Sequence, residues 1–139
     1  RFLFIPHDSR KNENKLMLKL VKGLDGVDYY SCGCLDAEYE KHITKNFYFV
    51  ITGRMHLAIL TLPNKVPCIT IDYAGVKALG SLSHWGMEDF ALSSSDIEET
   101  LSGKIKELLS NYEEIIRELG RRYESVMLLA KKQLNKIGD

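Results

Sequence analysis

Short apolar runs that alternate with helical segments constrain the fold of this chain more than any other feature. The run at residues 47–51 is aromatic and β-branched without interruption, which predicts a strand. Gly53 follows the end of this strand, residues 56–62 have the pattern of a helix, and residues 68–71 form another strand-like run. Strands that are apolar on both faces, joined by connections too long for hairpins, predict right-handed βαβ units around an open parallel sheet.

The same alternation extends over most of the chain. We expect further strands at residues 2–5, 27–32 and 90–92, and further helices at residues 12–24, 36–44 and 77–83. The predicted class is therefore α/β, a Rossmann-like open parallel sheet flanked by helices.

Long helices are expected near the carboxyl terminus. Ser95 and Glu98 have the spacing of a capping box, and apolar residues then recur every three or four positions, with breaks or kinks at Gly103 and Gly120. We expect a Rossmann-like core over residues 1–95 and amphipathic helices over residues 96–139, which pack on the same domain or on a partner that is missing from this sequence. Because the first residue is Arg1 and a strand-like run begins at once, we expect the chain to be part of a longer protein.

Composition limits the partners of the protein. Nineteen basic and nineteen acidic residues give a formal net charge of zero, so no global field attracts nucleic acid or an anionic membrane. Any anion that binds must be captured locally. The three cysteines are odd in number and no Asn-x-Ser/Thr sequon occurs, which favours a reducing cytoplasm. Cys32 and Cys34 have no nearby second pair, so we expect no metal site.

The residues after the run at 47–51 have the chemistry of an anion site. In open α/β sheets, ligands bind beyond the carboxyl ends of the strands. Gly53 allows close backbone approach, and the amides at the start of the next helix favour an anion. Arg54 adds a planar fork for phosphate or carboxylate, and His56 can donate a proton near neutral pH. The alternative is that Arg54 pairs with a carboxylate of this chain and that His56 caps the local backbone.

These residues resemble a known family. Its hallmark is a strand that ends in Gly or Ser, then Arg-x-His and a small-apolar helix, then a Val-Pro strand and a Tyr with a following Lys. Here the hallmark corresponds to Gly53, Arg54, His56, the strand that starts at residue 66, Tyr73 and Lys77. Residues 5–8 also match a strand that ends in Pro-His. Over about residues 2–120 the chain is similar to the carboxyl-terminal half of the polysaccharide pyruvyl transferase family.

The resemblance implies one half of a two-domain enzyme whose fold is like that of the type-B glycosyltransferases (GT-B). Members transfer a pyruvyl group from phosphoenolpyruvate to two hydroxyls of a hexose, which makes a ketal on a cell-surface polysaccharide or exopolysaccharide. Arg54 and His56 match the functional Arg and His of the family and are the expected catalytic residues. The expected substrate-binding residues are Gly53, Met55, His7, Tyr73 and Lys77.

The resemblance also implies partners. Phosphoenolpyruvate is the expected donor and a saccharide the acceptor, with no further cofactor. We expect the chain to need the amino-terminal domain of the same protein, to be inactive alone, and to work in the cytoplasm near the inner membrane face. Two alternatives remain open, a GT-B-type glycosyltransferase or epimerase domain that uses a nucleotide sugar, and a non-catalytic binding domain.

Overall fold

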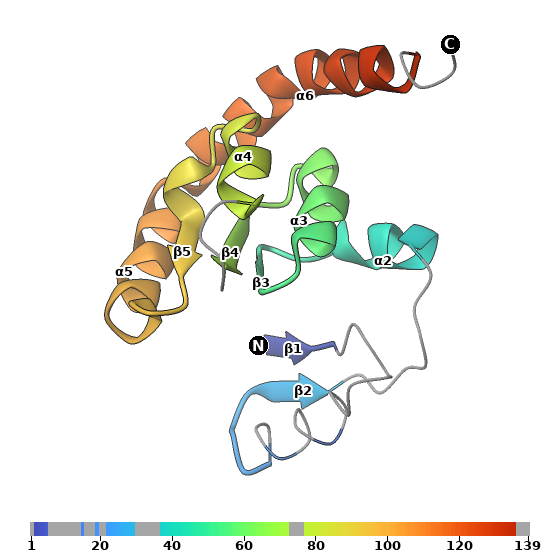
Figure 1. Ribbon diagram of the computed structural model, residues 1–139. Helices are drawn as coiled ribbons and strands as arrows, with labels where there is room; N and C mark the ends of the chain where they lie inside the picture. Colours follow the sequence, from blue (N-terminus) through green and yellow to red (C-terminus); the bar gives the residue numbers. More distant parts are fainter. Residues whose placement is uncertain are drawn as a thin grey trace. The chain divides into compact units, whose positions relative to one another are not determined.

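The computed structural model of this chain describes residues 2–5, 15, 19, 22–29, 37–72 and 77–135. The chain forms two compact units, Arg1–Tyr39 and Glu40–Asp139. Both contain parallel strands, and helices flank the sheet of the second unit, which confirms the predicted α/β class (Figure 1). The predicted division at residue 95 stays a prediction.

The first unit contains two parallel strands, β1 (Phe2–Phe4) and β2 (Val27–Tyr29). Phe2 is the partner of Val27, and its amide donates a hydrogen bond to the carbonyl of Gly26 at 3.0 Å. The helix expected at residues 12–24 lies mostly outside the described residues, as does the end of the strand expected at 27–32.

The second unit contains a sheet in the order β3-β4-β5, with all strands parallel. After α2 (Ala37–Thr44), its elements are β3 (Val50–Thr52), α3 (Met55–Thr61), the 3-10 turn η2 (Leu62–Asn64), β4 (Cys68–Asp72), α4 (Lys77–Ser83), the 3-10 turn η3 (Glu88–Phe90) and β5 (Ala91–Ser93). Helix α3 contacts β3 and β4, and α4 contacts β4 and β5. Two consecutive βαβ units therefore form the centre of this unit, as the alternation predicts.

The strand predicted at residues 47–51 begins later than expected, because other groups bind the backbone of its aromatic residues. The amide of Phe47 donates to the carbonyl of Thr44 at the end of α2, and the carbonyl of Tyr48 accepts a hydrogen bond from the hydroxyl of Tyr112. The ladder to β4 starts only at Val50, whose amide donates to the carbonyl of Pro67 at 2.9 Å.

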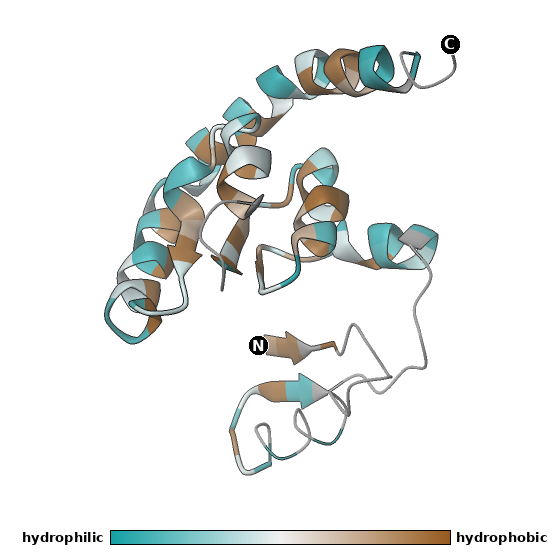
Figure 2. Ribbon diagram, in the orientation of Figure 1, coloured by the Kyte–Doolittle hydropathy of each residue, from teal (hydrophilic) through white to brown (hydrophobic). Residues whose placement is uncertain are grey.

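The core lies on β4 and on the helices around it. Cys68 and Ile69 of β4 have no exposed surface, and Thr70 is 2% exposed. Apolar side chains therefore gather between sheet and helices, where Figure 2 shows hydrophobic colour along the strands. Other buried members of this core are Val50, Ala58, Leu62, Val66, Leu82, Trp85, Met87, Phe90, Leu92, Leu108 and Leu119.

Two long helices follow the sheet, α5 (Ile97–Ser110) and α6 (Tyr112–Asn135). Neither Gly103 nor Gly120 breaks a helix, because both glycines lie inside helices and the chain turns at Asn111 instead. A kink at either glycine stays a prediction. Tertiary packing overrides the weak helix propensity of glycine at these two positions.

The predicted capping box at the start of α5 is also wrong. The N-cap residue is Asp96, which makes no side-chain capping bond. The hydroxyl of Ser95 donates to Oδ1 of Asp96 at 2.7 Å and is not directed at the helix. Leu108 of α5 and Leu119 of α6 are fully buried in the core, so burial holds these helices on the sheet without the cap.

Candidate functional site at the carboxyl edge of the sheet

The carboxyl ends of the three parallel strands meet at one edge of the second unit. Thr52 is the last residue of β3, Asp72 of β4 and Ser93 of β5. Asp72 and Ser93 are direct partners in the register, whereas Thr52 pairs with Thr70, so β4 extends two residues beyond the end of β3. This edge is where open α/β sheets bind their ligands.

The last residue of each strand accepts a hydrogen bond from the segment that follows it. Thr52 Oγ1 accepts from the amide of Arg54 at 2.9 Å, and Ser93 Oγ accepts from the amide of Ser95 at 3.3 Å. Asp72 Oδ2 accepts from the amide of Ala78, in the first turn of α4, also at 3.3 Å. Each strand end therefore fixes the direction in which the chain leaves the sheet.

The turn after β3 brings together four of the predicted site residues, Gly53, Arg54, Met55 and His56. Arg54 is the N-cap residue of α3, with extended backbone angles, φ −114° and ψ 110°. Its carbonyl accepts the amides of Leu57 at 3.1 Å and Ala58 at 3.4 Å. Gly53 and His56 are exposed, and Arg54 and Met55 are half-buried.

Helix α3 packs on the core through the side that faces away from His56, and this packing holds the turn in place. Ala58 and Thr61 have no exposed surface, and the hydroxyl of Thr61 donates to the carbonyl of Leu57 at 2.6 Å. The small side chain at Ala58 lets the helix approach the sheet closely. As a result His56, two residues before Ala58, points away from the packed side and can reach a ligand.

The remaining predicted site residues are described in part or not at all. His7 and Tyr73 lie outside the described residues, and Lys77 is the first residue of α4, with a side chain that is also outside them. The bond between Asp72 and Ala78 joins the two ends of the segment that carries Tyr73 and Lys77. No role is predicted from the sequence for Thr52, Asp72 or Ser93. The sequence feature that marks them is a short, oxygen-bearing side chain at the last position of each strand.

No metal centre is found in the described part of the chain, which holds no group of three or more His, Cys, Asp or Glu side chains able to bind a metal. The thiol of Cys68 is fully buried, and burial raises its pKa to about 12. A thiol that stays protonated inside the core is a packing group and not a nucleophile. Cys32 and Cys34 lie outside the described residues.

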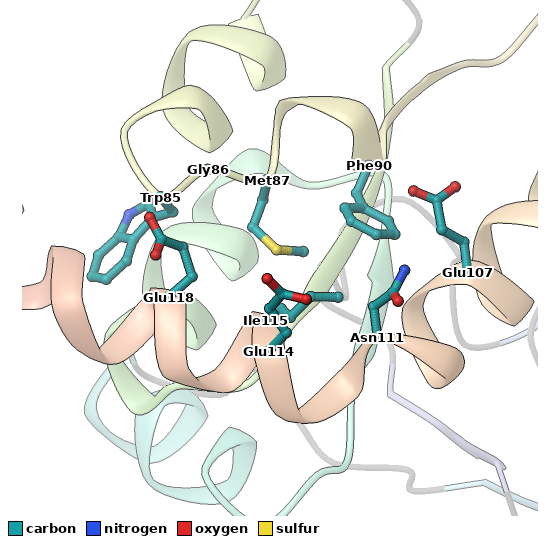
Figure 3. A pocket seen from close by; sticks show the side chains of 9 residues that line it. All are labelled: Trp85, Gly86, Met87, Phe90, Glu107, Asn111, Glu114, Ile115 and Glu118. Atoms are coloured by element: carbon teal, nitrogen blue, oxygen red, sulfur yellow. The ribbon is translucent and has the colours of Figure 1, made fainter.

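A surface pocket of about 320 Å³ lies at the other end of β5 (Figure 3). Four of its lining residues, Trp85, Gly86, Met87 and Phe90, precede the amino end of that strand. The others come from α5, from the turn at Asn111 and from α6, and they are Glu107, Asn111, Glu114, Ile115 and Glu118. Glu107 bonds Lys104 at 2.8 Å, and Glu118 bonds Arg122 at 2.6 Å, which lowers the pKa of Glu118. Two of the three carboxylates of this pocket are thus already paired with basic side chains. The edge formed by the carboxyl ends of the strands remains the candidate site.

Part of the chain is similar in sequence to a known protein. Over 89 residues it is 30% identical to the "Amylovoran biosynthesis protein AmsJ" of Erwinia amylovora. The match covers 61% of this chain and 20% of that protein, so the chain spans about a fifth of the length of the relative it matches. No protein-family model and no solved structure matches the chain.

In the described residues, no helix has both the length and the apolar character that are needed to cross a membrane.

Proposed function

We propose that this chain acts in exopolysaccharide biosynthesis as the second, Rossmann-like domain of a polysaccharide pyruvyl transferase. The similarity to an amylovoran biosynthesis protein supports the class of polymer. The observation that supports the reaction type is that one turn, at the carboxyl edge of a parallel sheet, holds both Arg54 and His56.

The donor in this proposal is phosphoenolpyruvate, which carries a phosphate and a carboxylate. A protein with zero net charge has no long-range attraction for such a ligand, so a local cation must bind it. Arg54 is half-buried, and its guanidinium is a planar fork that fits either anionic group bidentately. Arg54 would hold the donor and neutralise the charge that develops as phosphate leaves.

His56 would act as the general acid. Protonation of the enol methylene gives an oxocarbenium-like centre at C2, which one sugar hydroxyl attacks with loss of its proton. Cleavage of the bond between C2 and the phosphate oxygen releases phosphate and restores the oxocarbenium-like centre, and the second hydroxyl adds to the same carbon with loss of its own proton to close the ketal. Because His56 is exposed in the described unit, the proposal includes the amino-terminal domain of the same protein as the other wall of the cleft.

The test is pyruvyl transfer by the full-length protein with phosphoenolpyruvate and a saccharide acceptor, followed as phosphate release and as ketal formation. His56→Ala should lower kcat by roughly 10²–10⁴-fold, the usual contribution of a positioned acid. Arg54→Ala should raise KM for phosphoenolpyruvate, because it removes the anion contact, and should also lower kcat, because the charge on the leaving phosphate is no longer neutralised. The matched control is His84→Ala, since His84 is also exposed but follows α4 at the other end of the sheet. Wild-type transfer by His56→Ala would remove the acid role.

The second assay separates the proposal from a nucleotide-sugar enzyme on the same fold. Calorimetry should show heat on titration with phosphoenolpyruvate and none with a panel of nucleotide sugars. The reverse result would replace the proposal with a glycosyltransferase or epimerase domain. Full transfer activity of the 139-residue chain alone would contradict the two-domain part of the proposal.

A further inference from the structure

Thr52 is a buried residue whose side chain contacts the backbone of the candidate site. It is 8% exposed and is the last residue of β3. Its Oγ1 accepts the amide hydrogen of Arg54 at 2.9 Å. A threonine hydroxyl that accepts the amide two residues on forms a local turn and fixes the peptide between them.

We propose that Thr52 is a positioning residue for Arg54 and His56, and that the Thr52 hydroxyl sets the turn that presents both to the donor. This inference rests on the proposed function for the identity of the donor. The turn itself is independent of that function.

The hydroxyl of Thr52 acts on the backbone at the point where α3 begins. Arg54 is the N-cap of α3, and its carbonyl accepts the amides of Leu57 and Ala58. The two peptide groups that flank Arg54 are therefore both held, the one before it by Thr52 and the one after it by the first turn of α3. If the bond to Thr52 is lost, the Gly53–Arg54 peptide loses the hydrogen bond that fixes its orientation. The backbone at Arg54 and at the start of α3, which carries His56, then samples more conformations.

The chain contains two matched controls. Thr70 is the register partner of Thr52 on β4, is 2% exposed, and its Oγ1 has no hydrogen-bond partner within the described part of the chain. Thr70→Val therefore makes the same chemical change as Thr52→Val at a neighbouring buried position, but it removes no bond. Ser93 Oγ accepts the amide of Ser95 in the same manner as Thr52, but in a segment that carries no candidate site residue.

The first measurement is hydrogen exchange of the Arg54 amide, followed by NMR in the 139-residue chain. Thr52→Val should speed exchange of this amide by roughly two- to tenfold, the range expected from the loss of one hydrogen bond. Thr52→Ser should retain wild-type exchange because it retains the acceptor. Thr70→Val and Ser93→Ala should leave the Arg54 amide unchanged. Unchanged exchange in Thr52→Val, or equal acceleration in Thr70→Val, would overturn the inference.

The second measurement is the affinity for phosphoenolpyruvate in the full-length protein. Thr52→Val should weaken binding roughly two- to tenfold, Thr52→Ser should restore it, and both controls should bind as wild type. Faster exchange together with wild-type affinity in Thr52→Val would overturn the positioning role. If the wild-type protein binds no phosphoenolpyruvate, the proposed donor is wrong, and selective acceleration of the Arg54 amide still supports the hold of Thr52 on the turn.

Discussion

Individual residues at turns decide how the segments of the second unit meet. Gly86, between α4 and η3, has a φ of +69°, which L side chains rarely adopt. A Cβ at this position would lie 2.9 Å from Cζ of Arg122, whose Nη1 donates to the carbonyl of Ser83 at 3.2 Å. The missing side chain of Gly86 therefore makes room for the arginine that joins α6 to the end of α4.

The first stability prediction concerns this glycine. Gly86→Ala should lower the free energy of unfolding by about 1–3 kcal/mol, because it strains the left-handed backbone and displaces the guanidinium of Arg122. The control is Gly103→Ala, in the interior of α5, where a Cβ meets nothing within 4 Å. This control should raise the free energy of unfolding by about 0.5–1 kcal/mol. Urea unfolding measures both, and equal stability of the two variants would contradict the assignment.

At the scale of elements, the sequence predicts the order of strands and helices well and their ends less well. The alternation of apolar runs over residues 47–92 predicts β3, α3, β4, α4 and β5 in place, because each period is set by residues close in sequence. The breaks at Gly103 and Gly120 fail because burial of Leu108 and Leu119 outweighs local propensity.

The candidate site shows the same limit. Arg54 and His56 can be predicted from the strand-to-helix spacing, and the structure confirms that one turn carries them. The contact of Thr52 with Arg54 could be suspected from its position, but its burial and its 2.9 Å bond depend on the packed sheet. Bonds between elements distant in sequence cannot be predicted from local spacing at all.

One such bond joins the start of α6 to the segment before β3. The rings of Tyr48 and Tyr112 stack with centroids 3.8 Å apart and planes 7° apart. The hydroxyl of Tyr112 also donates to the carbonyl of Tyr48 at 3.1 Å. Burial, followed by the nearby Tyr48 and Glu113, raises the pKa of the Tyr112 hydroxyl, so it remains a donor at neutral pH.

Tyr112→Phe should therefore lower the free energy of unfolding by about 0.5–1.5 kcal/mol, the net value of one hydrogen bond. Tyr112→Ala should cost about 0.5–1.5 kcal/mol more through the lost stacking alone. The comparison is Tyr123→Phe on the same helix, where the ring packs at a tilt on Trp85 with centroids 6.5 Å apart. Thermal unfolding should show a smaller loss for Tyr123→Phe than for Tyr112→Phe. A larger loss for Tyr123→Phe than for Tyr112→Phe would show that the contact between Tyr112 and Tyr48 does not stabilise the turn between α5 and α6.

At the scale of the whole molecule, the described core belongs to one of the two compact units. Every member of the core lies between Phe47 and Val126, inside the unit Glu40–Asp139. The candidate turn at Gly53–His56 and the long helices lie in this unit as well. A unit of about 100 residues with its own core falls in the size range of domains that fold alone.

We therefore expect residues 37–139, which retain all of α2, to fold without the first 36 residues. Trp85 is the single tryptophan of the chain and is 5% exposed, so its fluorescence reports on this core directly. The shortened chain should unfold in one cooperative transition, with a urea midpoint close to that of residues 1–139, because it retains every side chain of the described core. Loss of the cooperative transition, or tryptophan emission at the solvent-exposed wavelength without urea, would show that the core depends on residues 1–36.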